Sequence, residues 1–278
     1  MFKSRGAFLN LTHFDPADWL AQLEAVDRLQ GLGHLELWVE FRPSRSQLNV
    51  MADLFADRLT IMHGPFIGMS LASEWEDLAR LSLDRCNWAV EIAAYLECEV
   101  VTFHAGPHAI FDSHRAAFER LAKRLAHLTT LAQPRVTLEN MPARGGASRE
   151  TLSMLDNMRE LIDLLPEICF TLDVGHCLQN VDDFTPFIEE HAERIANIHL
   201  HDGVTAGRSH MALGEGDLDV DVLLDTLDRA NYSGYLTLET LGAEDTAKSW
   251  AVLREKLVAL GQQDEEHASH GALNSGAA

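Results

Sequence analysis

Six short apolar runs in this chain each end on a histidine or on a carboxylate residue. The runs read LTIMH, VVTFH, RVTLE, CFTLD, ANIH and YLTLE. Their end residues are His63, His104, Glu139, Asp173, His199 and Glu239. Imidazoles and carboxylates are the side chains that bind divalent cations in proteins. The pattern therefore predicts a set of strands that delivers metal ligands to one place.

Helical patterns separate these runs. The clearest covers residues 73–96, where apolar side chains recur at three- and four-residue steps, as one face of a helix requires. Ser73 followed by Glu76 indicates a capping box at its start. Further helices are expected over residues 16–29, 47–55, 114–131, 148–165, 182–195 and 220–230. Strands that are apolar on both faces and alternate with helices indicate a parallel sheet.

The candidate strands are GAFLNL, HLELWVE, RLTIMH, VVTFH, RVTLE, CFTLD, ANIHLH and YLTLE. They predict an α/β fold, a single (β/α)8 TIM barrel over residues 1–258. Residues 259–278 have few bulky apolar side chains, so we expect a disordered tail. An open doubly wound sheet is the competing architecture, but no glycine-rich phosphate turn follows the first strand. Barrel enzymes carry their active sites at the carboxyl ends of the strands, where the six end residues fall.

Four of the end residues come from neighbouring strands of the expected barrel and form an oxygen-rich ligand set. These four are Glu139, Asp173, His199 and Glu239. His63 and His104 come from the two preceding strands, so a second cation could lie between them and Glu139. Two loop histidines should open onto the same face, His176 in DVGH and His210 in RSHMALGEGD. We expect one to three divalent ions, with Zn²⁺ or Mn²⁺ favoured and Mg²⁺ or Co²⁺ also suited.

Seven segments, taken in order, carry a family resemblance. They read HGPF, HAG, LEN, TLDVGH, IHLHD, HMALGEGDLD and LET. From Gly6 to about Leu257 the chain resembles the xylose-isomerase-like TIM barrels. This superfamily contains the sugar phosphate isomerases and epimerases and the type IV apurinic/apyrimidinic endonucleases, also called AP endonuclease family 2.

The resemblance implies roles for the candidate ligands. The four-residue set corresponds to the metal ligands that the sugar epimerases share. His63 and His104 correspond to further ligands of the endonuclease's second zinc, with Glu139 as the bridge. His176 and His210 correspond to two of the three ligands of its third zinc.

The chain departs from the endonuclease pattern in its loops. Arg208 stands where the endonucleases have an aspartate, Phe66 stands where they have a tyrosine, and the loop from His199 to His210 is shorter. The net charge is −21, from 22 basic and 43 acidic residues. Since nucleic-acid binders gain most of their non-specific affinity from basic contacts to phosphates, nucleic acid is not the expected partner. We expect a small-molecule substrate, a sugar or a sugar derivative.

Two catalytic interpretations follow from this ligand set. The favoured one is a divalent-metal-dependent sugar or sugar-phosphate isomerase or epimerase, in which a cation polarises a carbonyl group. Glu139 and Glu239 would then remove and return a proton, and His176 would orient the substrate. The alternative is a multinuclear zinc hydrolase, either an endonuclease IV-like phosphoesterase or an amidohydrolase. A non-catalytic metal- or ligand-binding barrel is the third hypothesis.

Several polar residues beside the ligands are expected to support the site. His201, Arg208 and Glu36 are predicted to contact the substrate, although Arg208 could instead cap a loop. Asn140, His201 and Asp202 lie one to three residues after predicted ligands and could also orient those ligands by hydrogen bonding.

Composition places the protein among globular chains. Hydrophobic residues make up 46% and charged residues 23%, which is ordinary for a soluble domain. No run of about 18 apolar residues or signal peptide is evident, so we expect a cytoplasmic protein without membrane contact. The sequence leaves an oligomer open and does not specify the substrate or the metal.

Overall fold

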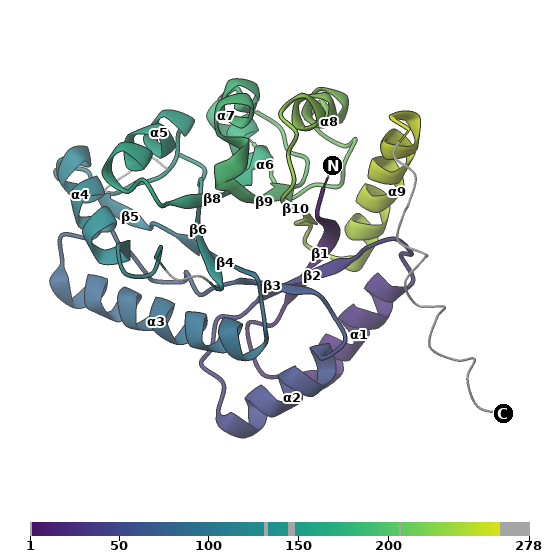
Figure 1. Ribbon diagram of the computed structural model, residues 1–278, viewed down its shortest axis with the longest axis horizontal. Helices are drawn as coiled ribbons and strands as arrows, with labels where there is room; N and C mark the ends of the chain where they lie inside the picture. The colour runs from purple at the N-terminus through teal and green to yellow at the C-terminus, as the bar shows by residue number, and fades with distance from the viewer. Residues whose placement is uncertain (1, 131–132, 144–147, 206, 262–278) are drawn as a thin grey trace.

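A computed structural model describes residues 2–130, 133–143, 148–205 and 207–261. Eight parallel strands close into a barrel in the order β1-β10-β9-β8-β6-β4-β3-β2 (Figure 1). These strands are β1 (Ser4–Asn10), β2 (His34–Trp38), β3 (Thr60–His63), β4 (Val100–His104), β6 (Arg135–Glu139), β8 (Cys169–Asp173), β9 (Ile195–Leu200) and β10 (Tyr235–Leu238). All eight predicted strands are confirmed, and the (β/α)8 barrel with them.

The helices surround the barrel on its outside (Figure 1). They are α1 (Pro16–Asp27), α2 (Arg45–Phe55), α3 (Glu76–Tyr95), α4 (His114–Leu125), α5 (Leu155–Leu164), α6 (Val174–Asn180), α7 (Phe184–His191), α8 (Val220–Arg229) and α9 (Ala243–Ala259), with a 3-10 turn at Ala192–Arg194. Helix α9 packs beside α1 and closes the ring. Side-chain caps start several helices: Asp15 accepts from the backbone of α1, and Ser44 forms a capping box with Gln47 on α2.

Two predicted helix starts are wrong. Trp75, in extended backbone, is the N-cap of α3, so Glu76 is the first helical residue rather than the third. Ser73 accepts from the Trp75 backbone instead of forming a capping box. The expected helix over residues 148–165 begins only at Leu155, because residues 148–150 form a strand.

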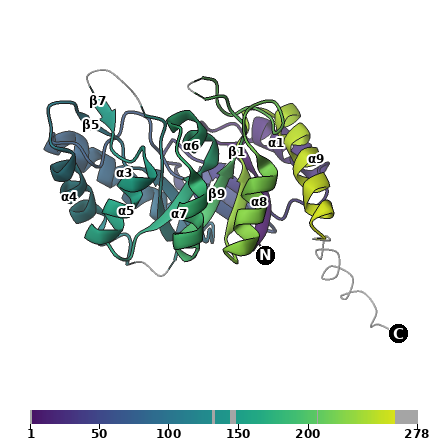
Figure 2. The same ribbon diagram turned by 90° about the horizontal axis from the view of Figure 1, so that it is seen from above.

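That strand, β7 (Ser148–Glu150), pairs antiparallel with β5 (Pro107–Ala109). The small sheet lies on the opposite side of the barrel from the N-terminus (Figure 2). It follows β4 and precedes α5, so it stands beside the carboxyl ends of the barrel strands.

Both faces of most barrel strands are buried, as the continuous apolar runs predict. Every residue of β3, β9 and β10 is buried. In the part of the chain that the structure describes, no helix is long and apolar enough to cross a membrane. Of the tail predicted over residues 259–278, Ala259 is instead the last residue of α9, and the part beyond Gly261 lies outside the described residues.

Candidate metal centre

The carboxyl ends of the barrel strands bring the candidate ligands together. Within the described residues, three groups have side-chain ligand atoms within 4.8 Å of one another. The groups are His63, His104 and Glu139; Glu139, Asp173, His199 and Glu239; and His176, His201 and His210. All eight residues predicted as metal ligands fall into them, together with His201.

The first group has the geometry of a metal site. The Nε2 atoms of His63 and His104 and the Oε2 atom of Glu139 form a triangle whose three edges are each 3.2 Å. Ligands of a tetrahedral ion with bonds of about 2.0 Å lie about 3.3 Å apart, so a Zn²⁺-sized cation fits this triangle. Nδ1 of His63 faces the Gly64 carbonyl at 2.9 Å. A carbonyl only accepts, so the ring proton sits on Nδ1, and Nε2 presents a lone pair to the triangle.

The second group contains buried polar atoms without hydrogen bonds. Nδ1 of His199 and Oε2 of Glu239 are both buried and lack a hydrogen-bond partner, although they lie 2.9 Å apart. Nδ1 of His199 also lies 3.5 Å from Oε2 of Glu139. Buried polar atoms are normally paired, so unpaired donor atoms that converge on one space fit a cation held between them. The three carboxylates in this group suit a hard or borderline divalent ion.

A polar network inside the barrel orients His199 from below. Its Nε2 atom lies 3.0 and 3.1 Å from the two carboxylate oxygens of Glu36. Glu36 also accepts from Asn197 at 2.8 Å, and Asn197 accepts from Thr237 at 3.0 Å. A carboxylate behind a ligating histidine fixes its tautomer and raises its basicity. Glu36 has no exposed surface, so it lies beneath the ligands rather than beside the open mouth.

Asn140, which directly follows Glu139, holds the backbone of Asp173. Its side-chain amide donates to the Asp173 carbonyl at 2.9 Å and accepts from the Asp173 backbone at 2.8 Å. Oδ1 of Asp173 caps α6 by accepting from the His176 backbone at 2.7 Å. The same cap turns the chain so that His176 follows Asp173 back into the site.

The buried carboxylates and imidazoles of the site shift one another's pKa values. Burial by itself would raise the pKa of the Glu139 carboxyl, but His199, His104 and His176 hold it well below its usual value. Burial by itself would lower the pKa of His176, but Asp173 and Glu139 raise it to about 9. At neutral pH His176 thus carries an additional proton, which must be released if the ring is to bind a metal.

Aromatic rings line one side of the first group. Phe66 stacks on the His104 ring at 4.3 Å and on the Trp38 ring at 5.2 Å, measured between centroids. Glu40 holds this arrangement, because its carboxylate accepts from the Trp38 indole and from the backbone of Phe66. Arg85 donates to the same carboxylate at 2.7 Å.

Some supporting residues escaped the sequence analysis. Asn197 lies two positions before His199 and therefore shares its strand face, a signal that strand alternation could have provided. Thr237 comes from a strand 40 positions later, so only the closed barrel reveals it as a partner. Arg208 lies on the loop that carries His210, and its side chain is exposed.

The fold and the side-chain groups define a class of protein, an α/β barrel with side chains able to hold a metal at the carboxyl ends of its strands. Residues 23–256 match the family described as Xylose isomerase-like TIM barrel. The chain therefore belongs to this family, as its motifs predict.

Two curated relatives illustrate the range of similar sequences. The uncharacterized protein MJ1614 of Methanocaldococcus jannaschii is 25% identical over 209 residues, which cover 71% of this chain and 80% of its own length. A protein of Thermotoga petrophila named Probable endonuclease 4 is 26% identical over 164 residues, which cover 53% of this chain and 57% of its own length.

Solved structures of both expected enzyme types share the fold. A D-tagatose 3-epimerase-like protein aligns with a TM-score of 0.79 at 21% identity, covering 93% of this chain and 98% of its own. Endonuclease IV from Thermus thermophilus aligns with a TM-score of 0.69 at 18% identity, covering 92% of this chain and 99% of its own. At such identities the likeness shows the fold alone, so the reaction must be argued from the site.

Proposed function

We propose that this protein is a multinuclear divalent-metal hydrolase that cleaves a phosphoester bond in a small molecule. The observation that carries the proposal is the triangle of His63, His104 and Glu139, whose dimensions suit a second cation next to the four-residue set. Polarising one carbonyl can be done with a single cation. Paired cations instead stabilise the attacking and the leaving oxygens of a displacement.

The surroundings of Glu139 support a bridging ligand rather than a proton carrier. Its Oε2 atom belongs to the triangle and lies 3.5 Å from His199, while Oε1 lies 3.4 Å from His176. Its pKa is held well below the usual value by the surrounding histidines, despite the opposing effect of burial. A general base works best with a pKa near the working pH, so this carboxylate suits coordination better than proton transfer.

The chain's own residues would then act in distinct roles. His63, oriented by the Gly64 carbonyl, and His199, oriented by Glu36, hold their ring nitrogens toward the cations. When bound, the cations acidify water and neutralise charge on the phosphoryl group. Glu239, whose Oε2 atom is turned toward the cation beside His199, would use its other carboxylate oxygen to accept the proton that the attacking water loses.

A small substrate agrees better with the charge of the chain than a nucleic acid does. The net charge of −21 repels a long polyanion, whereas a single phosphoester can be bound by the cations themselves. Arg208, exposed on the loop that carries His210, could contact the distal part of such a substrate. We assign Glu36 to positioning His199 rather than to substrate binding, because its carboxylate is fully buried.

The sugar isomerase or epimerase is the second candidate. The carboxylates of Glu139 and Glu239 favour this candidate, because one oxygen of each lies within 4.8 Å of the other in the same group. In this reaction they would exchange a proton with a substrate carbon, and His176 would orient the substrate. The epimerase-like fold neighbour adds support to this candidate but does not identify its substrate.

His104→Ala separates the two functions. It removes one corner of the triangle and leaves all four residues of the second group in place. For a hydrolase we expect the variant to lose one bound cation and at least about 100-fold in activity, because a cation supplies several kcal/mol of transition-state stabilisation. For an isomerase, solvent deuterium uptake into a ketose should persist in the variant.

The assay would use protein loaded with Zn²⁺ or Mn²⁺ and a panel of small phosphomonoesters, phosphodiesters, amides and ketoses. His127→Ala, which changes an exposed histidine away from the strand ends, is the matched control and should behave like the wild type. The proposed function would be excluded if the loaded wild type hydrolysed none of the phosphoesters, or if His104→Ala hydrolysed them as fast as the wild type.

A further inference from the structure

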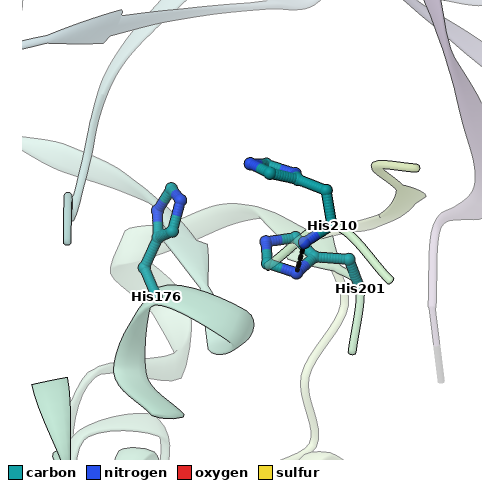
Figure 3. A group of neighbouring side chains, drawn as sticks. All are labelled: His176, His201 and His210. Carbon is teal, nitrogen blue, oxygen red and sulfur yellow. Dashed lines mark hydrogen bonds between the residues drawn. The ribbon is translucent and has the colours of Figure 1, made fainter. Parts of the chain in front are cut away.

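One buried histidine lies far from the mouth of the barrel. The histidines of the candidate metal centre lie at the carboxyl ends of the strands, among them His176, His201 and His210 (Figure 3). His34 is instead the first residue of β2, at the amino end of the barrel, and only 2% of it is exposed. Its ring packs against the backbone of β1, because a Cβ atom on Gly6 would lie 2.4 Å from its Cδ2 atom.

A chain of hydrogen bonds joins His34 to His199 through the barrel interior. Nε2 of His34 lies 3.0 Å from the Thr237 hydroxyl, which in turn lies 3.0 Å from Oδ1 of Asn197. Nδ2 of Asn197 lies 2.8 Å from the Glu36 carboxylate, and Nε2 of His199 approaches the same carboxylate at 3.0 Å. All five residues are buried, so bulk solvent does not compete for these bonds.

The direction of this chain follows from its carboxylate. Burial by itself would raise the pKa of Glu36, but His199 lowers it below its usual value, so Glu36 is ionised and only accepts. The amide nitrogen of Asn197 therefore faces Glu36, and its oxygen faces Thr237. That oxygen also only accepts, so the Thr237 hydroxyl donates to it. Because a hydroxyl has one hydrogen, Thr237 must accept from His34, which places the ring proton of His34 on Nε2.

The other ring nitrogen of His34 supports this assignment. Burial lowers the pKa of His34 to about 4, so the ring carries a single proton at neutral pH. Within the described residues, Nδ1 is buried and has no hydrogen-bond partner. A proton on Nδ1 would leave a buried N–H group unpaired and would also remove the donor that Thr237 requires. The chain therefore starts at His34, and every bond in it points toward Glu36.

The consequence of this direction falls on His199. Its Nε2 atom donates to Glu36, so Nδ1 turns a lone pair toward Oε2 of Glu239, 2.9 Å away. A histidine binds a metal through the nitrogen without a proton, and the partner of the other nitrogen decides which one that is. If the Asn197 amide turned over, its oxygen would face the Glu36 carboxylate, and repulsion between the two acceptors would displace Glu36 from His199.

We propose that His34 is a positioning residue for a cation at the four-residue group and acts through Thr237 and Asn197. As the first donor of the chain, it keeps the Thr237 hydroxyl turned toward Asn197 and thereby the Asn197 amide turned toward Glu36. Three hydrogen bonds separate His34 from Glu36, so the amino end of the barrel influences metal binding at the carboxyl end. The inference does not depend on hydrolysis, because an isomerase would use a cation at the same group.

The test is the Mn²⁺ affinity of the metal-free full chain, measured from the electron paramagnetic resonance signal of free Mn²⁺. Mn²⁺ favours carboxylate oxygens over imidazoles, so its tightest site reports the four-residue group. His34→Met removes the N–H donor, whereas His34→Gln places an amide N–H group near the position of Nε2. We expect His34→Met to raise the dissociation constant about tenfold, the lower end of the effect of residues behind a metal ligand, and His34→Gln to leave it unchanged. His127→Met changes an exposed histidine and is the matched control, which should bind like the wild type.

A second variant interrupts the chain at its next member. Thr237→Val keeps the shape of the side chain and removes the hydroxyl, so it should weaken Mn²⁺ binding as His34→Met does. The double variant should be no weaker than either single variant, because both changes interrupt the same chain and their effects are not additive. Thr237→Val also tests the proposal if His34→Met does not fold, and circular dichroism would establish folding for each variant.

A further measurement needs no variant. In a long-range proton–nitrogen NMR spectrum of the wild type at neutral pH, His34 should be neutral with its proton on Nε2. A proton on Nδ1 would overturn the proposal, as would the wild-type Mn²⁺ affinity in folded His34→Met or Thr237→Val. Equal weakening by His34→Gln and His34→Met would also overturn it, since only the packing of the ring would then matter. A wild type that binds no Mn²⁺ would overturn it as well.

Discussion

Replacing Glu36 by glutamine tests whether the barrel interior controls metal binding. The Glu36 carboxylate is fully buried and accepts hydrogen bonds from Asn197 at 2.8 Å and from His199 at 3.0 Å. Both oxygens are used as acceptors. A glutamine amide offers only one oxygen, so its NH₂ group must face one of these two N–H donors.

The size of the effect follows from this mismatch. One buried donor is left without an acceptor, which costs about 1–3 kcal/mol of folding free energy. His199 also loses the negative charge behind its ring, and changes of this kind typically weaken metal binding about 10–100-fold. We therefore expect Glu36→Gln to raise the dissociation constant of the metal at the four-residue group by that factor.

Competition with a chelator of known affinity would measure this constant, and circular dichroism would confirm that the variant folds. Glu24→Gln removes the same charge from an exposed position on α1 and should bind metal like the wild type. A folded Glu36→Gln protein with unchanged metal affinity would refute the positioning role. If its KM rose while its metal affinity stayed the same, Glu36 would contact the substrate, as the sequence alone suggests.

Three further predictions concern stability. Asp202→Asn should lower the free energy of unfolding by about 2–3 kcal/mol in urea titrations, because its new NH₂ group faces backbone donors; equal stability would contradict this. Zn²⁺ at about 100 times its dissociation constant should add about 2.7 kcal/mol, raising the melting temperature of EDTA-treated protein by several degrees, and an unchanged melt would argue against a native metal site. Burial by itself would lower the pKa of His176, but Asp173 and Glu139 raise it to about 9 in the folded, metal-free protein. Protonated His176 therefore stabilises the folded state, and this contribution is complete below pH 6.5 and declines as the pH rises toward 9. The melting temperature of EDTA-treated protein should therefore fall between pH 6.5 and pH 9, and it should fall less in His176→Gln. A melting temperature that rises over this range would contradict the prediction.

Much of the site could be predicted because parallel strands align their carboxyl ends. Once the apolar runs are taken as strands, a ligand at the end of each must reach the same edge of the barrel. His63, His104 and Glu139 are far apart in the chain, yet they meet with edges of 3.2 Å. Each apolar run predicted as a strand forms a strand in the structure, so the tertiary contacts agree with the local sequence pattern.

Short and irregular features could not be predicted in the same way. Strands β5 and β7 have only three residues each and no periodic signal. The start of α3 depends on the extended backbone of Trp75, which no spacing of Ser73 and Glu76 reveals. Such details depend on how loops pack against the finished barrel.

By itself, the sequence determined the barrel, the family and the residues able to bind metal, because these follow from local apolar pattern and from the chemistry of strand-end side chains. Only the tertiary structure decided how those residues are grouped. Strand alternation places Glu36 on one face, but closure of the barrel turns that face toward His199 and away from solvent. Likewise, His201 joins His176 and His210 only because the ring fits over Gly175 and Asp202 holds the loop, contacts that depend on depth and packing rather than on order along the chain.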